Sequence, residues 1–97
     1  MNRYVILMSF TGKGVDAVRQ SPERADGFRA TAQKMGCKVH SIFWTMGPHD
    51  GVVTFEAPND ETASALVLSG EQHGFVTTCT LRAFDESEFK SIVSKLK

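Results

Sequence analysis

The sequence lacks a surplus of either charge. Its 97 residues contain 11 Lys and Arg against 11 Asp and Glu, so the formal net charge at pH 7 is zero. This composition does not provide the broad cationic field that gathers phosphate backbones. We therefore expect no nucleic acid among the partners of this chain.

The sequence also lacks a long hydrophobic run and a dense set of cysteines. The apolar stretch within residues 1–8 is far too short to span a membrane, and no small-residue cleavage site follows it. Cys37 and Cys79 stand far apart without CxxC spacing, so both are predicted to be reduced and buried. These features predict a cytoplasmic protein with no membrane partner.

Motifs for metal, phosphate or hydrolytic chemistry are missing as well. His40, His49 and His73 show neither i, i+4 nor His-x-His spacing, which argues against a metal site. Residues 11–14 lack the full spacing of a phosphate-binding loop, and no nucleophile elbow is present. We predict no metal and no cofactor.

What is present suits one domain over residues 1–97. A chain of this size buries only roughly 60–70% of the surface that its unfolded form exposes. Self-association would cover more apolar area, which makes a homodimer or higher homo-oligomer attractive for this chain.

Hydrophobic patterning and turn residues predict the order of the elements. Strands are expected at residues 3–10, 37–46, 52–57 and 75–84, where apolar or alternating stretches are bounded by Gly and Pro. After a short helical turn at 15–20, helices are expected at 21–36, 59–70 and 85–96, with Ser21, Asn59 or Asp60, and Asp85 as capping residues. The order is β-α-β-β-α-β followed by a C-terminal helix.

This order is that of ferredoxin-like folds and predicts the α+β class. We expect a four-stranded antiparallel sheet with strand order 4-1-3-2, in which two right-handed crossovers place both main helices on one face. If the even-numbered strand residues point to the other, open face, it carries Tyr4, Ile6, Met8, His40, Ile42, Trp44, Val52, Thr54, Glu56, Thr78, Thr80 and Arg82. A one-residue shift in the second strand would exchange Phe43 for Trp44. A face with this many apolar residues usually marks an association surface. We therefore expect two copies to stack their sheets there, about 10 Å apart.

Several side chains of this predicted face are capable of chemistry. His40, Trp44, Glu56 and Arg82 would face a cavity between subunits, where burial and opposite charges shift protonation equilibria and would permit an acid–base role. The alternative interpretation is a buried Glu56–Arg82 pair beside a tryptophan at the dimer interface. Cys79 is assigned to the opposite face, beneath the helices.

Two further candidates lie at the predicted hairpin tip. His49 and Asp50 could orient a substrate or a water, because imidazole titrates near neutral pH and a carboxylate can fix its tautomer. The alternative is a turn in which Asp50 accepts backbone amides.

Five segments with a specific order and spacing resemble a known family. They are Tyr4-Val5-Ile6-Leu7 with Phe10-Thr11, Ser21-Pro22-Glu23-Arg24, the run from Phe43 to Asp50, the run from Glu56 to Ala63, and Thr80-Leu81-Arg82-Ala83-Phe84. Together they resemble the GYD-domain family over almost the whole chain. The resemblance implies a dimeric α/β barrel of two opposed ferredoxin-like subunits, and it implies no established activity.

The chain departs from this family at the hairpin. Members usually carry Gly-x-Tyr-Asp, whereas this chain has Gly47-Pro48-His49-Asp50. An imidazole thus replaces the phenol, and a role of the tyrosine hydroxyl is not carried over to His49.

Three classes of function are compatible with the sequence. The first is a binding module whose intersubunit cavity, lined by Tyr4, Met8, Trp44 and Thr78, accepts a small apolar or aromatic ligand. The second is a cofactor-independent oxygenase or isomerase of the dimeric α/β-barrel type, for which the warrant is fold analogy. The third is a purely structural or interaction role with a filled, dry interface.

Overall fold

The computed structural model describes residues 1–97 and has the predicted order of elements. The strands are β1 (Asn2–Phe10), β2 (Lys38–Trp44), β3 (Gly51–Ala57) and β4 (Val76–Ala83). The helices are α1 (Gly12–Asp16), α2 (Ser21–Lys34), α3 (Asp60–Glu71) and α4 (Glu86–Val93), with a 3₁₀ turn, η1 (Val18–Gln20), before α2. The β-α-β-β-α-β order and the C-terminal helix are therefore confirmed.

Helix starts agree with the predicted capping chemistry at two of three positions. The Asn59 side chain accepts a hydrogen bond from the Thr62 amide at 2.8 Å, and Asp85 forms a capping box with Glu88 at the start of α4. Ser21, however, is wrong as a cap, because it is the first residue of α2 and makes no capping bond. Its hydroxyl accepts a hydrogen bond from Arg24 at 3.0 Å instead.

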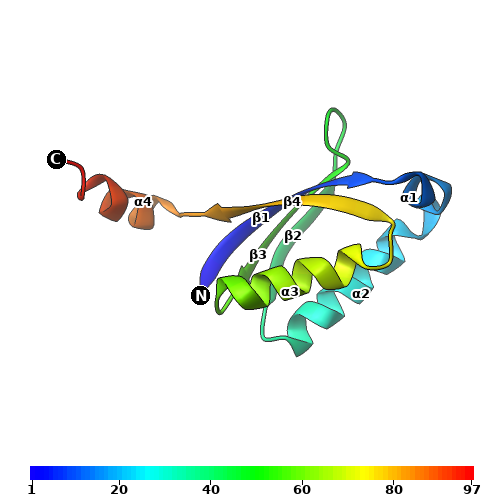
Figure 1. Cartoon of the computed structure of the whole chain (residues 1–97), viewed down its shortest axis with the longest axis horizontal. Coiled ribbons are helices and arrows are strands. Elements are labelled where there is room, and N and C mark those ends of the chain that lie inside the picture. The colour runs from blue at the N-terminus through cyan, green and yellow to red at the C-terminus, as the bar shows by residue number, and fades with distance from the viewer.

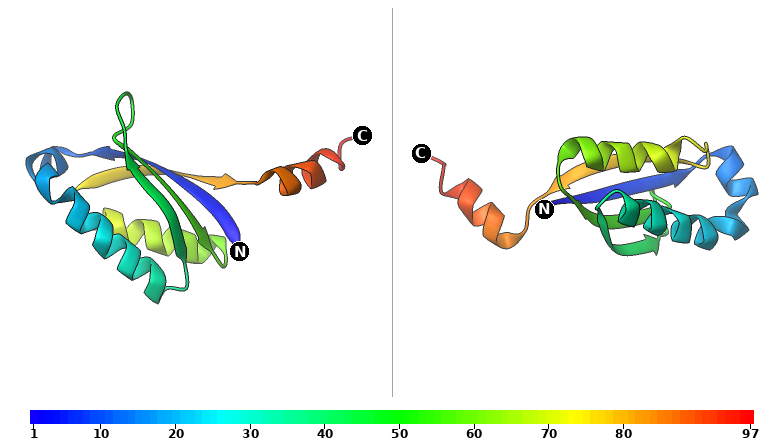
Figure 2. Two further views of the ribbon diagram at one scale, coloured as in Figure 1. Left: turned by 180° about the vertical axis from the view of Figure 1, so that it is seen from behind. Right: turned by 90° about the horizontal axis from the view of Figure 1, so that it is seen from below.

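The four strands form one antiparallel sheet in the order β2-β3-β1-β4, which is the predicted order read from the other edge. Helices α2 and α3 lie side by side on one face of this sheet (Figures 1 and 2), with α2 against β2 and α3 against β3 and β4. The opposite face is not covered by this chain. The result is a two-layer α+β fold with one open sheet face.

The core lies between the sheet and the two helices. Phe55 and Leu66 are fully buried, and the ring of Tyr4 stacks on Phe55 with centroids 5.2 Å apart. Small residues such as Ala32 and Ala63 let the helices approach the strands closely.

The predicted facing of β1 and β4 is wrong. Tyr4, Ile6 and Met8 point toward the helices, where Tyr4 and Ile6 are buried. The register pairs Tyr4 with Arg82, so Thr78, Thr80 and Arg82 share that helix-covered face. The alternate residues of both strands therefore form the open face, including Arg3, Val5, Leu7, Cys79, Leu81 and Ala83.

The predicted facing of β3 is correct, and β2 changes face along its length. Val52, Thr54 and Glu56 are on the open face because their neighbours Val53, Phe55 and Ala57 are in the core. A bulge between Val39 and Ser41 shifts the alternation of β2. The prediction for His40 is therefore correct, but Ile42 and Trp44 lie on the helix side and Phe43 on the open face.

Helix α4 extends away from the rest of the molecule, beyond the end of β4 (Figure 1). None of its residues is buried. Phe89, Ile92, Val93 and Leu96 recur at three- and four-residue steps, and the apolar stripe that they form is exposed. Within one copy of the chain, this stripe has no surface to cover.

Candidate ligand pocket and predicted site residues

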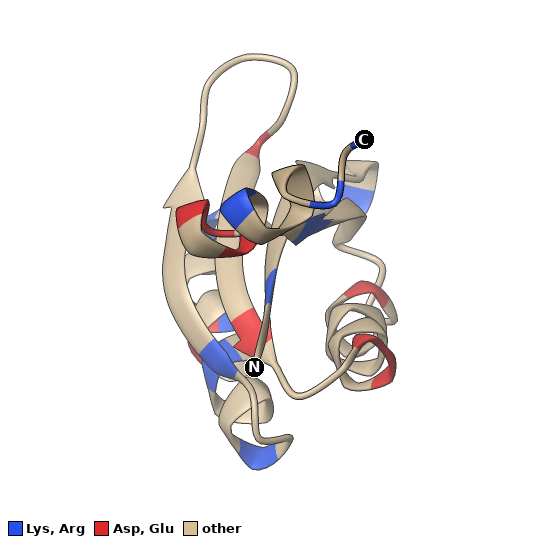
Figure 3. Cartoon of the chain, turned by 90° about the vertical axis from the view of Figure 1, so that its left-hand side faces the viewer, with Lys and Arg blue, Asp and Glu red and all other residues tan.

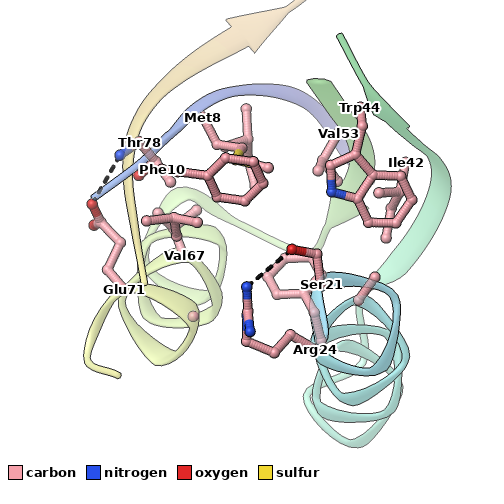
Figure 4. Close-up of a pocket in the computed structure, with 15 residues that line it drawn as sticks. Met8, Phe10, Ser21, Arg24, Ile42, Trp44, Val53, Val67, Glu71 and Thr78 are labelled. Carbon is pink, nitrogen blue, oxygen red and sulfur yellow. Dashed lines mark hydrogen bonds between the residues drawn. The ribbon is translucent and has the colours of Figure 1, made fainter. Parts of the chain in front are cut away.

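A pocket with a volume of about 110 Å³ lies between the helix-covered face of the sheet and helices α2 and α3 (Figure 4). Ten of its 15 lining residues are hydrophobic. The wall comprises Ile6, Met8, Phe10, Ser21, Arg24, Ala25, Phe28, Ile42, Trp44, Val53, Val67, Gly70, Glu71, Val76 and Thr78. The interior is therefore an apolar space within one subunit, partly open to solvent.

The local sequence explains why these side chains converge. Ala25 and Phe28 are three residues apart, so they share the face of α2 that meets the sheet. The bulge in β2 turns Trp44 to the helix side at the end of its strand. Gly70 leaves room on α3, since a Cβ there would already touch the Phe28 ring at 3.5 Å.

Polar groups stand on both sides of the pocket. On the α2 side, Arg24 donates hydrogen bonds to the Ala17 carbonyl at 2.9 Å and to Ser21 Oγ at 3.0 Å. On the α3 side, Glu71 Oε2 accepts a hydrogen bond from the Thr78 amide at 3.0 Å. Figure 4 shows the Arg24 and Glu71 side chains extending from different helices.

The structure brings together part of the predicted ligand set, in a different place from the one expected. Met8, Trp44 and Thr78 all line this pocket. The cavity was expected between two subunits, whereas these three residues enclose one within a single subunit. The correction follows from the facing of β1 and β4 and from the bulge in β2.

Tyr4 and Arg82 line an adjoining groove of about 520 Å³ between α3 and β4. Its wall shares Val67, Glu71 and Thr78 with the pocket, so the two spaces are neighbours. The Tyr4 phenol donates a hydrogen bond to Asp60 Oδ1 at 2.5 Å. The pKa of Tyr4 is raised above its usual value near 10. Burial is the larger cause, and this hydrogen bond to a carboxylate is the second.

The predicted Glu56–Arg82 pair is wrong, because the two residues lie on opposite faces of the sheet. Arg82 stacks over the rings of Tyr4 and Phe84 and has Glu88 within 3.8 Å. Its guanidinium also donates to the backbone carbonyl of Ala83.

Glu56 is instead part of a charged cluster on the open face. Its Oε2 lies 2.6 Å from His40 Nε2, and Arg3 approaches Oε1 at 3.9 Å. The hydrogen bond from His40 is the main cause that lowers the pKa of Glu56, and the positive charge of Arg3 contributes. His40 and Glu56 are thus separated by the sheet from the pocket that holds Trp44.

At the hairpin, Asp50 accepts a backbone amide, as in the second of the two predicted arrangements. The Asp50 carboxylate accepts the Phe10 amide at 2.8 Å, and its backbone N–H donates to the Met8 carbonyl at 2.8 Å. The His49 carbonyl accepts from the Thr45 hydroxyl at 2.7 Å. Asp50 therefore fixes the hairpin against the end of β1.

The cysteines differ from each other. Cys37 is buried as predicted, and burial raises the pKa of its thiol. Cys79 is exposed on the open face, so its predicted place beneath the helices is wrong.

The chain offers neither a cluster of metal-ligating side chains nor a helix suited to a bilayer. No group of three or more His, Cys, Asp or Glu side chains is arranged to hold a metal ion. None of the helices combines the length and the apolar character that crossing a bilayer would need.

Comparison with known proteins places the chain in a family. The model of the GYD domain matches residues 4–93, which is nearly the whole chain. The chain belongs to the GYD domain family. The resemblance noted in the sequence is thereby confirmed. No curated protein sequence matches this GYD domain.

Solved structures share the fold of this GYD domain. The crystal structure of FFRP-DM1 superposes with a TM-score of 0.61 at 16% identity, covering 87% of this chain and 100% of that one. The crystal structure of TTHA0845 from Thermus thermophilus has a TM-score of 0.56 at 21% identity, covering 88% of this chain and 95% of that one. At these identities, the likeness concerns the fold.

Most of the pocket wall in this GYD domain was not predicted from the sequence, including Arg24, Phe28 and Glu71. Phe28 has the spacing of a core-facing helix residue, and neither Arg24 nor Glu71 belongs to a recognisable binding motif. A signal existed for Arg24, because it precedes Ala25 and stands four residues before Phe28 on the same helix. Glu71 gave no comparable signal, since only the α3–β4 connection brings it to the pocket.

Proposed function

We propose that this GYD domain is a small-molecule-binding module and that its site is the pocket beneath α2 and α3. The observation that carries the proposal is the convergence of Met8, Phe10 and Trp44 around an unfilled apolar volume of about 110 Å³. A closed apolar cavity of about 150 Å³ binds benzene, and this pocket is smaller but partly open to solvent. The ligand that suits this pocket is therefore compact, with one ring or a short branched chain.

The open sheet face supports self-association as the second part of the proposal. Leu81 and Phe43 are 45% and 62% exposed there, while the helix-facing side of β4 carries Thr78, Thr80 and Arg82. The open face of β4 is thus more apolar than the face that the helices cover, which suits a partner bound to the open face. We infer that the partner is a second copy of the chain, stacked face to face.

The dimensions of this face are consistent with a dimer. Four strands about 4.8 Å apart and about 23 Å long give a footprint of roughly 450 Å². Side chains standing on it expose more area than the footprint, and the stripe of α4 adds to it. Stable interfaces bury about 800 Å² per partner, so the proposed dimer needs the stripe of α4 in addition to the sheet face.

The enzymatic alternative has less support from the geometry. It required His40, Glu56 or Arg82 to converge on one cavity. The sheet separates the first two from both the pocket and Arg82. The titratable side chains at the pocket are Arg24 and Glu71, and each already holds a hydrogen bond. We therefore favour binding over catalysis.

The only tryptophan of the chain lines the pocket and reports on its occupancy. Titrating the protein with toluene or benzyl alcohol should change the fluorescence of Trp44 in a saturable manner. Ala25→Met should abolish the change, because Ala25 lines the pocket and a longer side chain would fill it. Ala30→Met is the matched control, since Ala30 is exposed on the same helix. Equal responses of the two variants would contradict the proposal.

A further inference from the structure

The guanidinium of Arg24 is half-buried at the wall of an apolar pocket without a carboxylate partner. The ion pairs of this chain join Arg3, Arg29, His40, Arg82 and Lys90 to acidic groups, and Arg24 is in none of them. A partly desolvated positive charge is costly unless an opposite charge compensates it. The positive charge of Arg24 at the pocket wall is therefore not neutralised by an acidic side chain within 4 Å.

Arg24 is held in place by groups that leave most of its donors free. Two of its five N–H donors are used, one for the Ala17 carbonyl and one for Ser21 Oγ. The guanidinium carbon also lies 4.2 Å from the centre of the Phe75 ring. Bonding and stacking fix the plane of the guanidinium, which is the preorganisation that recognition of a planar anion needs.

A second positive charge, that of Lys13, lies over the same Phe75 ring. Lys13 Nζ lies 4.5 Å from the centre of Phe75 and donates to the His73 carbonyl at 2.8 Å. It too lacks a carboxylate within 4 Å. The potential beside Arg24 is therefore positive, and it is not cancelled on the α2 side of the pocket.

Glu71 restricts the anion that fits. Its carboxylate lines the α3 side of the pocket, where the Thr78 amide holds it. A second negative charge on the ligand would approach Glu71 and be repelled. The site thus favours a single negative charge on the side of α2.

Building on the proposed function, we propose that the ligand is a monocarboxylate with a compact apolar group. The carboxylate accepts charge-assisted hydrogen bonds from the free N–H groups of Arg24, and the ring or branched chain enters the space beside Trp44 and Phe28. Benzoate has this combination of one charge and one ring.

The test compares benzoate with the uncharged benzamide and the cationic benzylamine on the full-length chain. Binding is followed by Trp44 fluorescence and by amide chemical shifts of α2. We expect benzoate to bind at least about tenfold more tightly than benzamide, since hydrogen bonds to charged groups are the stronger ones. Benzylamine should bind most weakly, and added salt should weaken benzoate selectively.

Variants locate the charge that is responsible. Arg24→Gln should remove the preference for benzoate while retaining the affinity for benzamide, and Arg24→Lys should keep part of it. Arg29→Gln is the matched control on the exposed side of α2 and should change neither.

Two outcomes would overturn the inference, and they are distinguishable. If benzoate and benzamide bind equally to the unaltered protein, the carboxylate assignment is wrong and the proposed function stands. If none of the three probes binds at the pocket, both are wrong. The first comparison needs no variant, so a folding defect of Arg24→Gln would not obscure it.

Discussion

At the scale of single residues, the direction in which a side chain points decides its chemistry in this protein. Tyr4 was expected on an open face and is instead 4% exposed beneath α3. Its phenol is thereby confined with Asp60, a residue 56 positions away. Glu56, on the opposite face, instead lies in hydrogen-bond contact with His40.

Tyr4 is the only tyrosine, so its ionisation can be followed directly by ultraviolet absorbance. Asp60→Asn should lower the pKa of Tyr4, because it removes a carboxylate that stabilises the neutral phenol. The pKa should remain above its usual value, since burial is the larger cause. The stability that this contact provides is complete below about pH 10 and is lost as the pH rises through the raised pKa of Tyr4.

Asn2→Ala provides a control of opposite sign. The Asn2 side chain donates to the Tyr4 hydroxyl at 3.3 Å and lowers its pKa. Removing that donor should therefore raise the pKa further. A titration curve that both substitutions leave unchanged would contradict the described environment of Tyr4.

At the scale of elements, two connections that are distant in the sequence are fixed to each other. The start of α1 is tied to the connection between α3 and β4, because the Thr11 amide donates to the Phe75 carbonyl at 3.0 Å and the Thr11 hydroxyl to the Gly74 carbonyl at 2.6 Å. Gly14 is buried in this contact. Residues 11–14, which lack the spacing of a phosphate-binding loop, thus form the start of a short helix packed against the connection that precedes β4.

Replacing Gly14 by alanine should destabilise the fold. An ideal Cβ at Gly14 would lie 2.0 Å from the carbonyl oxygen of Phe75, a backbone atom directly before β4 that also accepts the Thr11 amide. We expect a loss of about 1–3 kcal/mol in the free energy of unfolding, measured by urea denaturation at fixed protein concentration. Gly12→Ala in the same helix has nothing within 4 Å of its Cβ and should change the stability little. Equal losses for both would contradict this packing.

At the scale of the whole molecule, the shape is extended for its length. The radius of gyration is 14.6 Å, whereas about 12.5 Å is expected of a compact chain of this size. Helix α4, at one end of the 51 Å long axis in Figure 1, accounts for the difference. Charges of both signs are interspersed (Figure 3), so no strong field opposes association of two copies.

The proposed dimer has a direct test in solution. The unaltered protein should have about twice the chain mass of 10.7 kDa in light scattering at micromolar concentration. Leu81→Asp should weaken the dimer by roughly a hundredfold or more, because each copy loses about 1.5–3 kcal/mol of apolar burial and gains a charge at the interface.

Leu68→Asp is the matched control for this experiment. Leu68 is 63% exposed on α3, away from the open face. That variant should remain dimeric. A monomeric unaltered protein, or equal mass for both variants, would contradict the proposed interface.

The sequence by itself determined the order of the elements, the order of the strands and the family. Turn residues such as Gly36 and Pro58 separate the elements, and the capping residues Asn59 and Asp85 begin helices where they were predicted. The strand order followed from the β-α-β-β-α-β order of the elements. The handedness of the two crossovers, which depends on backbone chirality rather than on particular side chains, placed both main helices on one face. Such properties depend on local sequence patterns or on the order of the elements, so they can be predicted from one sequence.

Only the tertiary structure decided which face of each strand is buried, and so where the pocket lies. In β1, residues 4–8 are all apolar, so alternation gives no direction. In β4 the more apolar side faces outward, and in β2 a bulge shifts the alternation at His40. Met8, Trp44 and Thr78 were identified as ligand candidates, but Arg24 and Glu71 join them only through the packing of α2 and α3 on the sheet. The buried face of each strand depends on how distant segments pack together. A local sequence pattern does not contain that information, so it could not locate the pocket.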